Sequence, residues 1–360
     1  MHKALATVAT LILGVCGGLA FDALGAPAAY LIGSACAITL GVVVGLPVHL
    51  PNSLRLVAFA VIGTMLGSQI TPGVVGTILL LPLAVVGLAL ATYGATAASY
   101  LVLHRGAGWD RVTALCGSIP GAFSIVIAAA EDKGAAMERV LTAQALRLFI
   151  LVSLVPLVLG GGEPPPTVAE HGAAAIAASF AIAVVCGTLA YAAKAATTAL
   201  LLPLAVAGTL SASGLVSVAV PQVVADGAFA VLGASVAVRF TAIKRDEAVA
   251  ILGASFAAFV AAGTVAVAVA VPFAWLTAEP LGEIFLAYAP GGVDAMIALS
   301  FLLGYDVALV SMLHATRLVM LAVSVPLLLS FQIKRLARVA PHNAADAAIL
   351  THDEGERDGR

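Results

Sequence analysis

Long apolar stretches with few charges dominate the chain and recur from residue 4 to about residue 331. Most are about 18–25 residues long, the length that an α-helix needs to cross the hydrocarbon core of a membrane. The pattern predicts an all-α polytopic membrane protein. In the first half the stretches lie near residues 4–21, 26–46, 54–70, 75–103, 112–130 and 138–160, and the second half repeats them 170 positions later.

Individual residues also repeat at this spacing. No gap is needed to align the two copies, which indicates an internal duplication. The aligned pairs include Pro51 with Pro221, Pro120 with Pro290, Gly121 with Gly291, Gly134 with Gly304, Arg147 with Arg317 and Pro156 with Pro326.

A turn-rich segment with three glycines and three prolines separates the copies. We predict a first membrane repeat at 1–160, a linker at 161–172, a second membrane repeat at 173–331 and a cytoplasmic tail at 332–360. The first apolar run could pass for a secretory signal peptide. Because it has a counterpart around Cys186, we expect it to be retained as the first transmembrane helix.

The two Pro-Gly segments decide the predicted topology, since each either crosses the membrane or dips in and returns. If they cross, the basic cluster at 239–245 falls outside, opposite to Lys3. If they are re-entrant, Lys3, Arg55, this cluster and the tail all lie in the cytoplasm, as the positive-inside rule requires. We therefore predict a five-plus-five inverted repeat of ten transmembrane helices with two re-entrant or broken segments. Both termini would lie on the cytoplasmic side of a bacterial-type inner membrane.

Composition narrows the function classes. The chain is 62% hydrophobic and 10% charged, with a mean hydropathy of +1.11. The net charge of −2 argues against direct nucleic-acid binding. The four cysteines have no CxxC spacing and the seven histidines form no HExxH motif, so we predict no metal, cofactor or catalytic residue.

The paired Pro-Gly breaks are the candidate ligand site. Proline removes a backbone donor and glycine frees φ, so each helix is interrupted, and the following half-helix presents unpaired N–H groups that favour an anion. A single Pro-Gly is more often a packing kink, but a pair in an inverted repeat is typical of secondary transporters. We expect the breaks to meet near the midplane. The predicted site comprises Ser118, Pro120, Gly121 and Ser124 in the first copy, and Tyr288, Pro290, Gly291, Gly292 and Asp294 in the second.

An arginine lies deep in the helix after each break, Arg147 in one copy and Arg317 in the other. Each would be on the order of 13–17 Å from the surface where its helix begins, and an arginine at such depth needs a partner. Gln144 and His314 lie three residues earlier on the same helix faces. Two roles stay open for the arginines: clamping the unwound segment of the other half, or binding an anion. Asp294 is a candidate for coupling to H⁺ or Na⁺ or for an ion pair with an arginine, and His314 is a second candidate for coupling.

The chain contains Pro-Gly-Gly-x-x-x-Met at 290–296 and Pro-Gly at 120–121, and a helix with the pattern Gln/His-x2-Arg follows each of these motifs. In these features it resembles the AbrB-type duplicated integral membrane protein family. The resemblance covers nearly the whole chain. The first copy departs from the family pattern with Ala122, and the second places Asp294 one position early. The family carries the labels membrane regulator and ammonia monooxygenase, and it is similar to the cation:proton antiporter and anion transporter superfamily.

Three functions follow as expectations. The first is a secondary transporter of a small anionic metabolite working by alternating access. The second is a membrane sensor that regulates gene expression through a partner, and the third, least supported by the residues, is an enzyme of the ammonia monooxygenase type. We expect the lipid bilayer and a small-molecule or ion ligand as partners, with no direct contact to nucleic acid. The chain could also pair as a homodimer.

Overall fold

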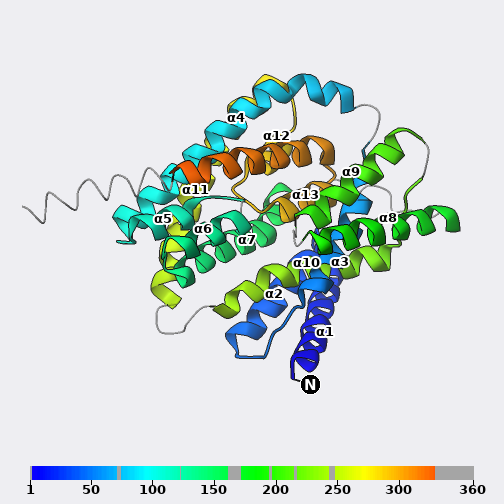
Figure 1. Cartoon of the computed structure of the whole chain (residues 1–360), viewed down its shortest axis with the longest axis horizontal. Coiled ribbons are helices and arrows are strands. Elements are labelled where there is room, and N and C mark those ends of the chain that lie inside the picture. The colour runs from blue at the N-terminus through cyan, green and yellow to red at the C-terminus, as the bar shows by residue number, and fades with distance from the viewer. Residues whose placement is uncertain are drawn as a thin grey trace, which may run out of the picture.

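The structure is a computed structural model that describes residues 2–70, 74–121, 123–160, 172–193, 197–214, 217–242 and 248–328. This part is helical and contains no β-strand (Figure 1). Seven of its helices are long and apolar enough to cross a membrane. An all-α membrane protein was therefore the right prediction, whereas the count of ten spans stays a prediction. The tail and all of the predicted linker except Gly172 lie outside the described residues.

The helices recur in the same order in the two halves. The first half contains α1 (His2–Ala23), α2 (Ala29–Val43), α3 (Asn52–Gly67), α4 (Val74–Leu101) with the π-helical turn η1 (Val102–Gly106), α5 (Arg111–Ser118), α6 (Phe123–Asp132) and α7 (Met137–Leu159). The second contains α8 (Ala173–Ala192), α9 (Thr198–Ala212), α10 (Gln222–Ala237) with the 3₁₀ turn η2 (Val238–Ala242), α11 (Ala248–Thr277), α12 (Leu281–Tyr288), α13 (Val293–Leu302) and a last helix, Val307–Leu328.

Three helix pairs begin and end 170 positions apart: α3 with α10, α5 with α12, and α6 with α13. Local chemistry explains the shared boundaries. Pro51 and Pro221 precede α3 and α10 as their N-cap residues, where a proline lacks no needed donor. Gly134 and Gly304 both adopt positive φ in the turns that follow α6 and α13, a conformation that glycine allows without steric cost.

The helices form two bundles, each drawn from both halves. In the first bundle, α3 packs on α8 and α9, α10 packs on α1 and α2, and α3 contacts α10. In the second bundle, α4 packs along α11, α5 and α6 pack on α7, and α12 packs on α11 and α13 (Figure 1). The last helix joins this bundle through its hydrogen bonds to the end of α12. Glycines allow the close crossings of the first bundle: a Cβ on Gly63 would overlap the Leu200 carbonyl oxygen, and one on Gly233 the Leu31 carbonyl oxygen. Small residues at crossings are how helices associate in lipid.

Candidate functional site

Both Pro-Gly segments interrupt their helices. The chain leaves α5 with Ile119 in an extended conformation and leaves α12 with Ala289 in the same way. The first break runs to the start of α6 at Phe123, and the second to the start of α13 at Val293. Each break therefore exposes carbonyl groups that no helix satisfies, and a buried carbonyl needs a hydrogen-bond donor.

Arg147 supplies donors to the first break. Its Nη1 donates to the Ser118 carbonyl at 3.3 Å and its Nη2 to the Ile119 carbonyl at 3.0 Å. Nη2 also donates to Oε1 of Gln144. Gln144 in turn donates from Nε2 to the carbonyls of Cys116 at 3.0 Å and Ile119 at 2.9 Å. Arg147 and Gln144 are both buried, so together they satisfy the unwound backbone.

Arg317 does the same for the second break. It donates from Nη1 to the Ala289 carbonyl at 2.6 Å and from Nη2 to the Gly291 carbonyl at 2.8 Å. Nη2 also lies 2.6 Å from Nδ1 of His314, and Nε2 of His314 lies 3.0 Å from the Leu286 carbonyl oxygen. Because a guanidinium only donates, Nδ1 must accept and the ring proton must be on Nε2. His314 is therefore neutral here and plays the part of Gln144.

These contacts correct one expectation. Arg147 and Arg317 each hold the unwound segment of their own half, whereas the clamp was predicted to act on the other half. The reason is connectivity: the helix that carries each arginine follows the second half-helix and lies against the half-helix before the break, as the packing of α5 on α7 and the hydrogen bonds of the last helix to the end of α12 show. A contact between halves does exist, since a Cβ on Gly121 would lie 2.9 Å from Nη2 of Arg317 and 3.1 Å from the Gly291 carbonyl oxygen. The two breaks thus touch.

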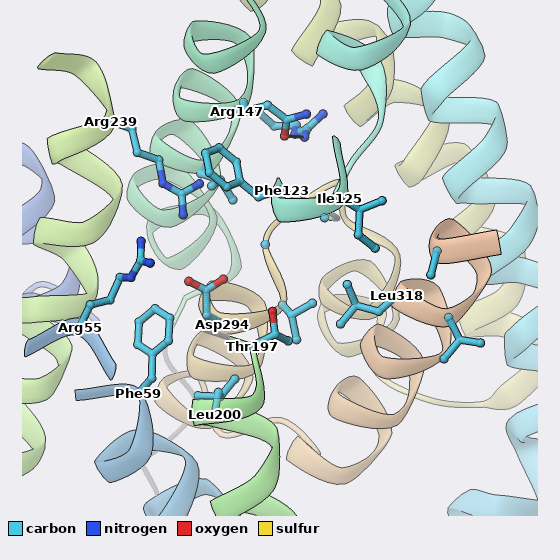
Figure 2. A pocket seen from close by; sticks show the side chains of 17 residues that line it. Arg55, Phe59, Phe123, Ile125, Arg147, Thr197, Leu200, Arg239, Asp294 and Leu318 are labelled. Carbon is cyan, nitrogen blue, oxygen red and sulfur yellow. Dashed lines mark hydrogen bonds between the residues drawn. The ribbon is translucent and has the colours of Figure 1, made fainter. Parts of the chain in front are cut away.

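A cavity of about 430 Å³ opens beside the paired breaks, between the two bundles (Figure 2). Its wall is shared by the bundles, so its shape depends on how they sit against each other. The first bundle contributes Arg55, Phe59, Thr197, Leu200 and Arg239, and the second contributes Gly121, Phe123, Ile125, Gln144, Arg147, Leu148, Gly292, Val293, Asp294, Leu318, Val319 and Ala322.

Three arginines and one acid set the charge of this cavity. Figure 2 shows Arg55 and Arg239 reaching in from the first bundle, with the Asp294 carboxylate pointing toward them from the second. No ion pair within 4.0 Å joins Asp294 to either arginine. The guanidinium of Arg239 lies over the Phe123 ring, 4.3 Å from its centroid. The side chains give the cavity a net positive charge.

Each cavity arginine keeps a buried nitrogen without a hydrogen-bond partner among the described residues: Nε of Arg55, Nε of Arg147 and Nη1 of Arg239. An unsatisfied buried charged donor costs free energy, because water has been lost without replacement. The first-turn N–H groups of α13, beside Val293 and Asp294, also lack intrahelical partners. The cavity therefore offers several unused donors to an acceptor-rich ligand.

The structure separates the predicted site residues into groups with different surroundings. Tyr288 points away from the cavity, donating its hydroxyl to the Ala84 carbonyl at 3.0 Å. The side chain of Ser124 lies outside the described part. Gly121, Gln144, Arg147, Gly292 and Asp294 line the cavity. Ser118, Pro120, Pro290, Gly291, His314 and Arg317 form or hold the breaks behind it.

Comparison with known proteins found a family model and a relative that each match most of the chain. The family model described as "Transition state regulatory protein AbrB" matches residues 30–332. The chain belongs to the AbrB family. It is 23% identical over 342 residues to an Escherichia coli (strain K12) protein named "Putative regulator AbrB", and the match covers 93% of this chain and 97% of that protein. No solved structure was found to match.

Several residues that line the cavity of this AbrB-family chain were not predicted as site residues from the sequence, above all Arg55 and Arg239. Both were expected in cytoplasmic loops, but Arg55 belongs to the first turn of α3 and Arg239 to the turn that extends α10. Their repeat counterparts are Ala225 and Gln69, so the duplication does not mark them. The one available signal was the apolar context of Arg239, which stands between Val238 and Phe240.

Within the ranges that the structure describes, no group of three or more His, Cys, Asp or Glu side chains is placed to hold a metal ion.

Proposed function

We propose that this AbrB-family protein is a secondary transporter of a small anionic metabolite that works by alternating access. The observation that carries the proposal is the cavity beside the two breaks, where three arginines present buried nitrogens without a partner among the described residues. Anions bind where convergent donors and positive charge have already lost their water. A carboxylate or phosphate would supply the missing acceptors.

The arginines would divide the work. Arg317 and most donors of Arg147 are used by the break carbonyls, so they fix the shape of the site. Among the described residues, Arg55 and Arg239 contact no break carbonyl, and they project into the cavity from the other bundle. They would therefore contact the ligand directly. The Asp294 carboxylate would compete with the ligand for Arg55 and Arg239. A bound anion would therefore weaken the attraction between Arg239 and Asp294.

Alternating access would come from the two bundles moving against each other. The two bundles share the cavity wall. Arg55 and Arg239 belong to the first bundle, whereas Asp294 and Arg147 belong to the second. A bound anion would bridge the bundles, and its departure would let them separate. The duplicated helix order and the reciprocal packing of α3 on α9 and α10 on α2 support a two-fold relation between the halves. The distribution of basic residues along the sequence favours the inverted form of that relation. In that arrangement each break would be re-entrant from its own side of a bacterial inner membrane.

A direct test begins with the purified full-length protein in detergent. Thermal unfolding is measured against a panel of mono-, di- and tricarboxylates and inorganic phosphate, since a ligand at about 100 times its Kd stabilises by about 2.7 kcal/mol. Each stabilising anion is then tested for uptake into proteoliposomes. Concentration-dependent stabilisation with saturable uptake supports the proposal. Binding without uptake, across imposed pH and sodium gradients of both signs, would refute transport.

A second candidate rests on the printed name of the Escherichia coli relative, which calls that protein a regulator. In this reading the same cavity senses an anion and a partner carries the signal to gene expression. Deleting residues 341–360 and profiling expression separates the two, because a carrier alone should not respond to that deletion. For either function we propose no catalytic role for the site.

A further inference from the structure

Glu283 is a buried acid in the first turn of α12, away from the cavity. Only 5% of it is exposed. Its Oε2 accepts a hydrogen bond from the Asp306 backbone N–H at 3.1 Å, which ties α12 to the start of the last helix. Its Oε1 is buried and has no hydrogen-bond partner within the described residues. A buried carboxylate oxygen without a donor is costly when charged.

The internal repeat shows that this tie does not need a charge. The first-half counterpart of Glu283 is Thr113, and that of Asp306 is Ala136, both 170 positions earlier. Oγ1 of Thr113 accepts a hydrogen bond from the Ala136 backbone N–H at 2.8 Å. A neutral hydroxyl therefore makes the same link between half-helix and following helix. The second half therefore places an ionisable carboxyl group where the first half makes the equivalent contact with a neutral hydroxyl.

The charged neighbours of Glu283 offer no compensation. Glu279 and Asp306 are the acids whose charges act on it, and Tyr305 lies beside it. Asp306 is already engaged as the cap of the last helix, accepting from the N–H groups of Ala308 and Leu309. Of the helices packed on α12, α11 has no ionisable side chain, α4 has only tyrosines, and α13 has only Asp294 at its far end. The last helix carries His314 and Arg317, which contact Leu286 and Ala289 toward the other end of α12.

We propose that Glu283 is a proton-binding site that makes the contact between α12 and the last helix depend on pH. Protonated, the carboxyl keeps its link to Asp306 and buries no charge. Deprotonated, it is an uncompensated carboxylate beside two other acids, and the contact weakens. The last helix carries His314 and Arg317, so the proton controls how firmly the second break is held. This inference does not depend on transport.

Titration would fall in the physiological range. Burial, followed by the charges of Asp306 and Glu279, raises the pKa of Glu283 to about 7 despite the opposing hydrogen bond from the Asp306 N–H. The unfolded chain has a glutamate pKa of about 4.3. Between these values the folded state binds the proton and the unfolded state does not, so stability falls as pH rises through this window.

The test compares thermal unfolding of the full-length protein in detergent between about pH 5 and about pH 8. Glu283→Gln keeps an acceptor for Asp306 and removes the titration, and Glu283→Thr installs the first-half residue. Glu279→Gln is the matched control. We expect the wild type and the control to lose unfolding temperature as pH rises. The unfolding temperature of both Glu283 variants should fall less over the same pH range. At the upper pH, Glu283→Gln should unfold at a higher temperature than the wild type. Infrared difference spectra should show a protonated carboxyl band in the wild type that titrates near neutrality and is missing in Glu283→Gln.

Two results would overturn the proposal. One is a pH dependence of unfolding that is the same in Glu283→Gln and the wild type. The other is a carboxyl band near neutral pH that survives in both Glu283 variants.

Discussion

Gly121 of the first break lies directly against the guanidinium of Arg317, which holds the second break. A Cβ at Gly121 would lie 2.9 Å from Nη2 of Arg317, and φ of this residue is +81°, where L side chains are rare. The two copies of the Pro-Gly motif are thus interlocked through the one residue type that leaves room for the arginine. The site is a joint product of both halves.

The interlock can be measured with one substitution and a matched control. Gly121→Ala should destabilise through both its positive φ and its contact with Arg317. Gly134→Ala has a similar φ of +68° but nothing within 4 Å of the added Cβ, so it should cost only the strain, about 1–2 kcal/mol. We expect Gly121→Ala to cost about 1–3 kcal/mol more by thermal or denaturant unfolding. Equal losses would mean that the breaks do not press on each other.

The equivalence of His314 and Gln144 leads to a second prediction. Both side chains accept from the arginine three residues later and contact a backbone carbonyl of the half-helix before the break, Cys116 for Gln144 and Leu286 for His314. Gln at 314 can make the same two bonds, whereas Leu leaves the Leu286 carbonyl without a donor, at about 1–3 kcal/mol. His314→Gln should therefore unfold within about 1 kcal/mol of the wild type and His314→Leu well below it. Comparable losses in the two variants would argue against this role.

Much of this architecture could be predicted from the sequence because the duplication carries it. Pro120 and Pro290 mark both helix interruptions, and Arg147 and Arg317 mark the helices that satisfy them. What the repeat could not indicate was the direction of the clamp, which depends on how each chain turns back after its break. The role of His314 was also hidden, since its tautomer follows from a three-dimensional contact with Arg317.

Close helix crossings in the first bundle allow a third prediction. A Cβ on Gly233 of α10 would overlap the Ser34 hydroxyl and the Leu31 carbonyl of α2, and α2 also donates a hydrogen bond from Ser34 to Ala230 at 2.8 Å. Gly233→Ala should cost about 1–3 kcal/mol by pushing the helices apart. Gly227→Ala on the same helix meets nothing within 4 Å and should gain about 0.5–1 kcal/mol from helix propensity. The contrast is read by thermal unfolding, and a neutral Gly233→Ala would contradict the packing.

The cavity itself was the least predictable part. It draws Arg55 and Arg239 from helix ends that carry no repeated signature, and it brings them to Asp294 only because the two bundles meet there. Site residues that have no counterpart in the other half cannot be found by comparing the two copies of the repeat. They are also the residues that distinguish the two sides of the cavity, which is why they bear most directly on its ligand.

The most direct test of the account is the response of Arg239→Gln to anions, with Arg105→Gln, an exposed arginine outside the cavity, as its control. The substitution removes the contact of the guanidinium with the Phe123 ring, but it also removes the cost of burying Nη1 without a partner within the described part of the chain, so unfolding without ligand should stay close to that of the wild type. We predict that it abolishes the anion-dependent rise in unfolding temperature, while Arg105→Gln retains it. If Arg239→Gln folds normally and binds the same anions with unchanged Kd, the cavity beside the breaks is not the anion site.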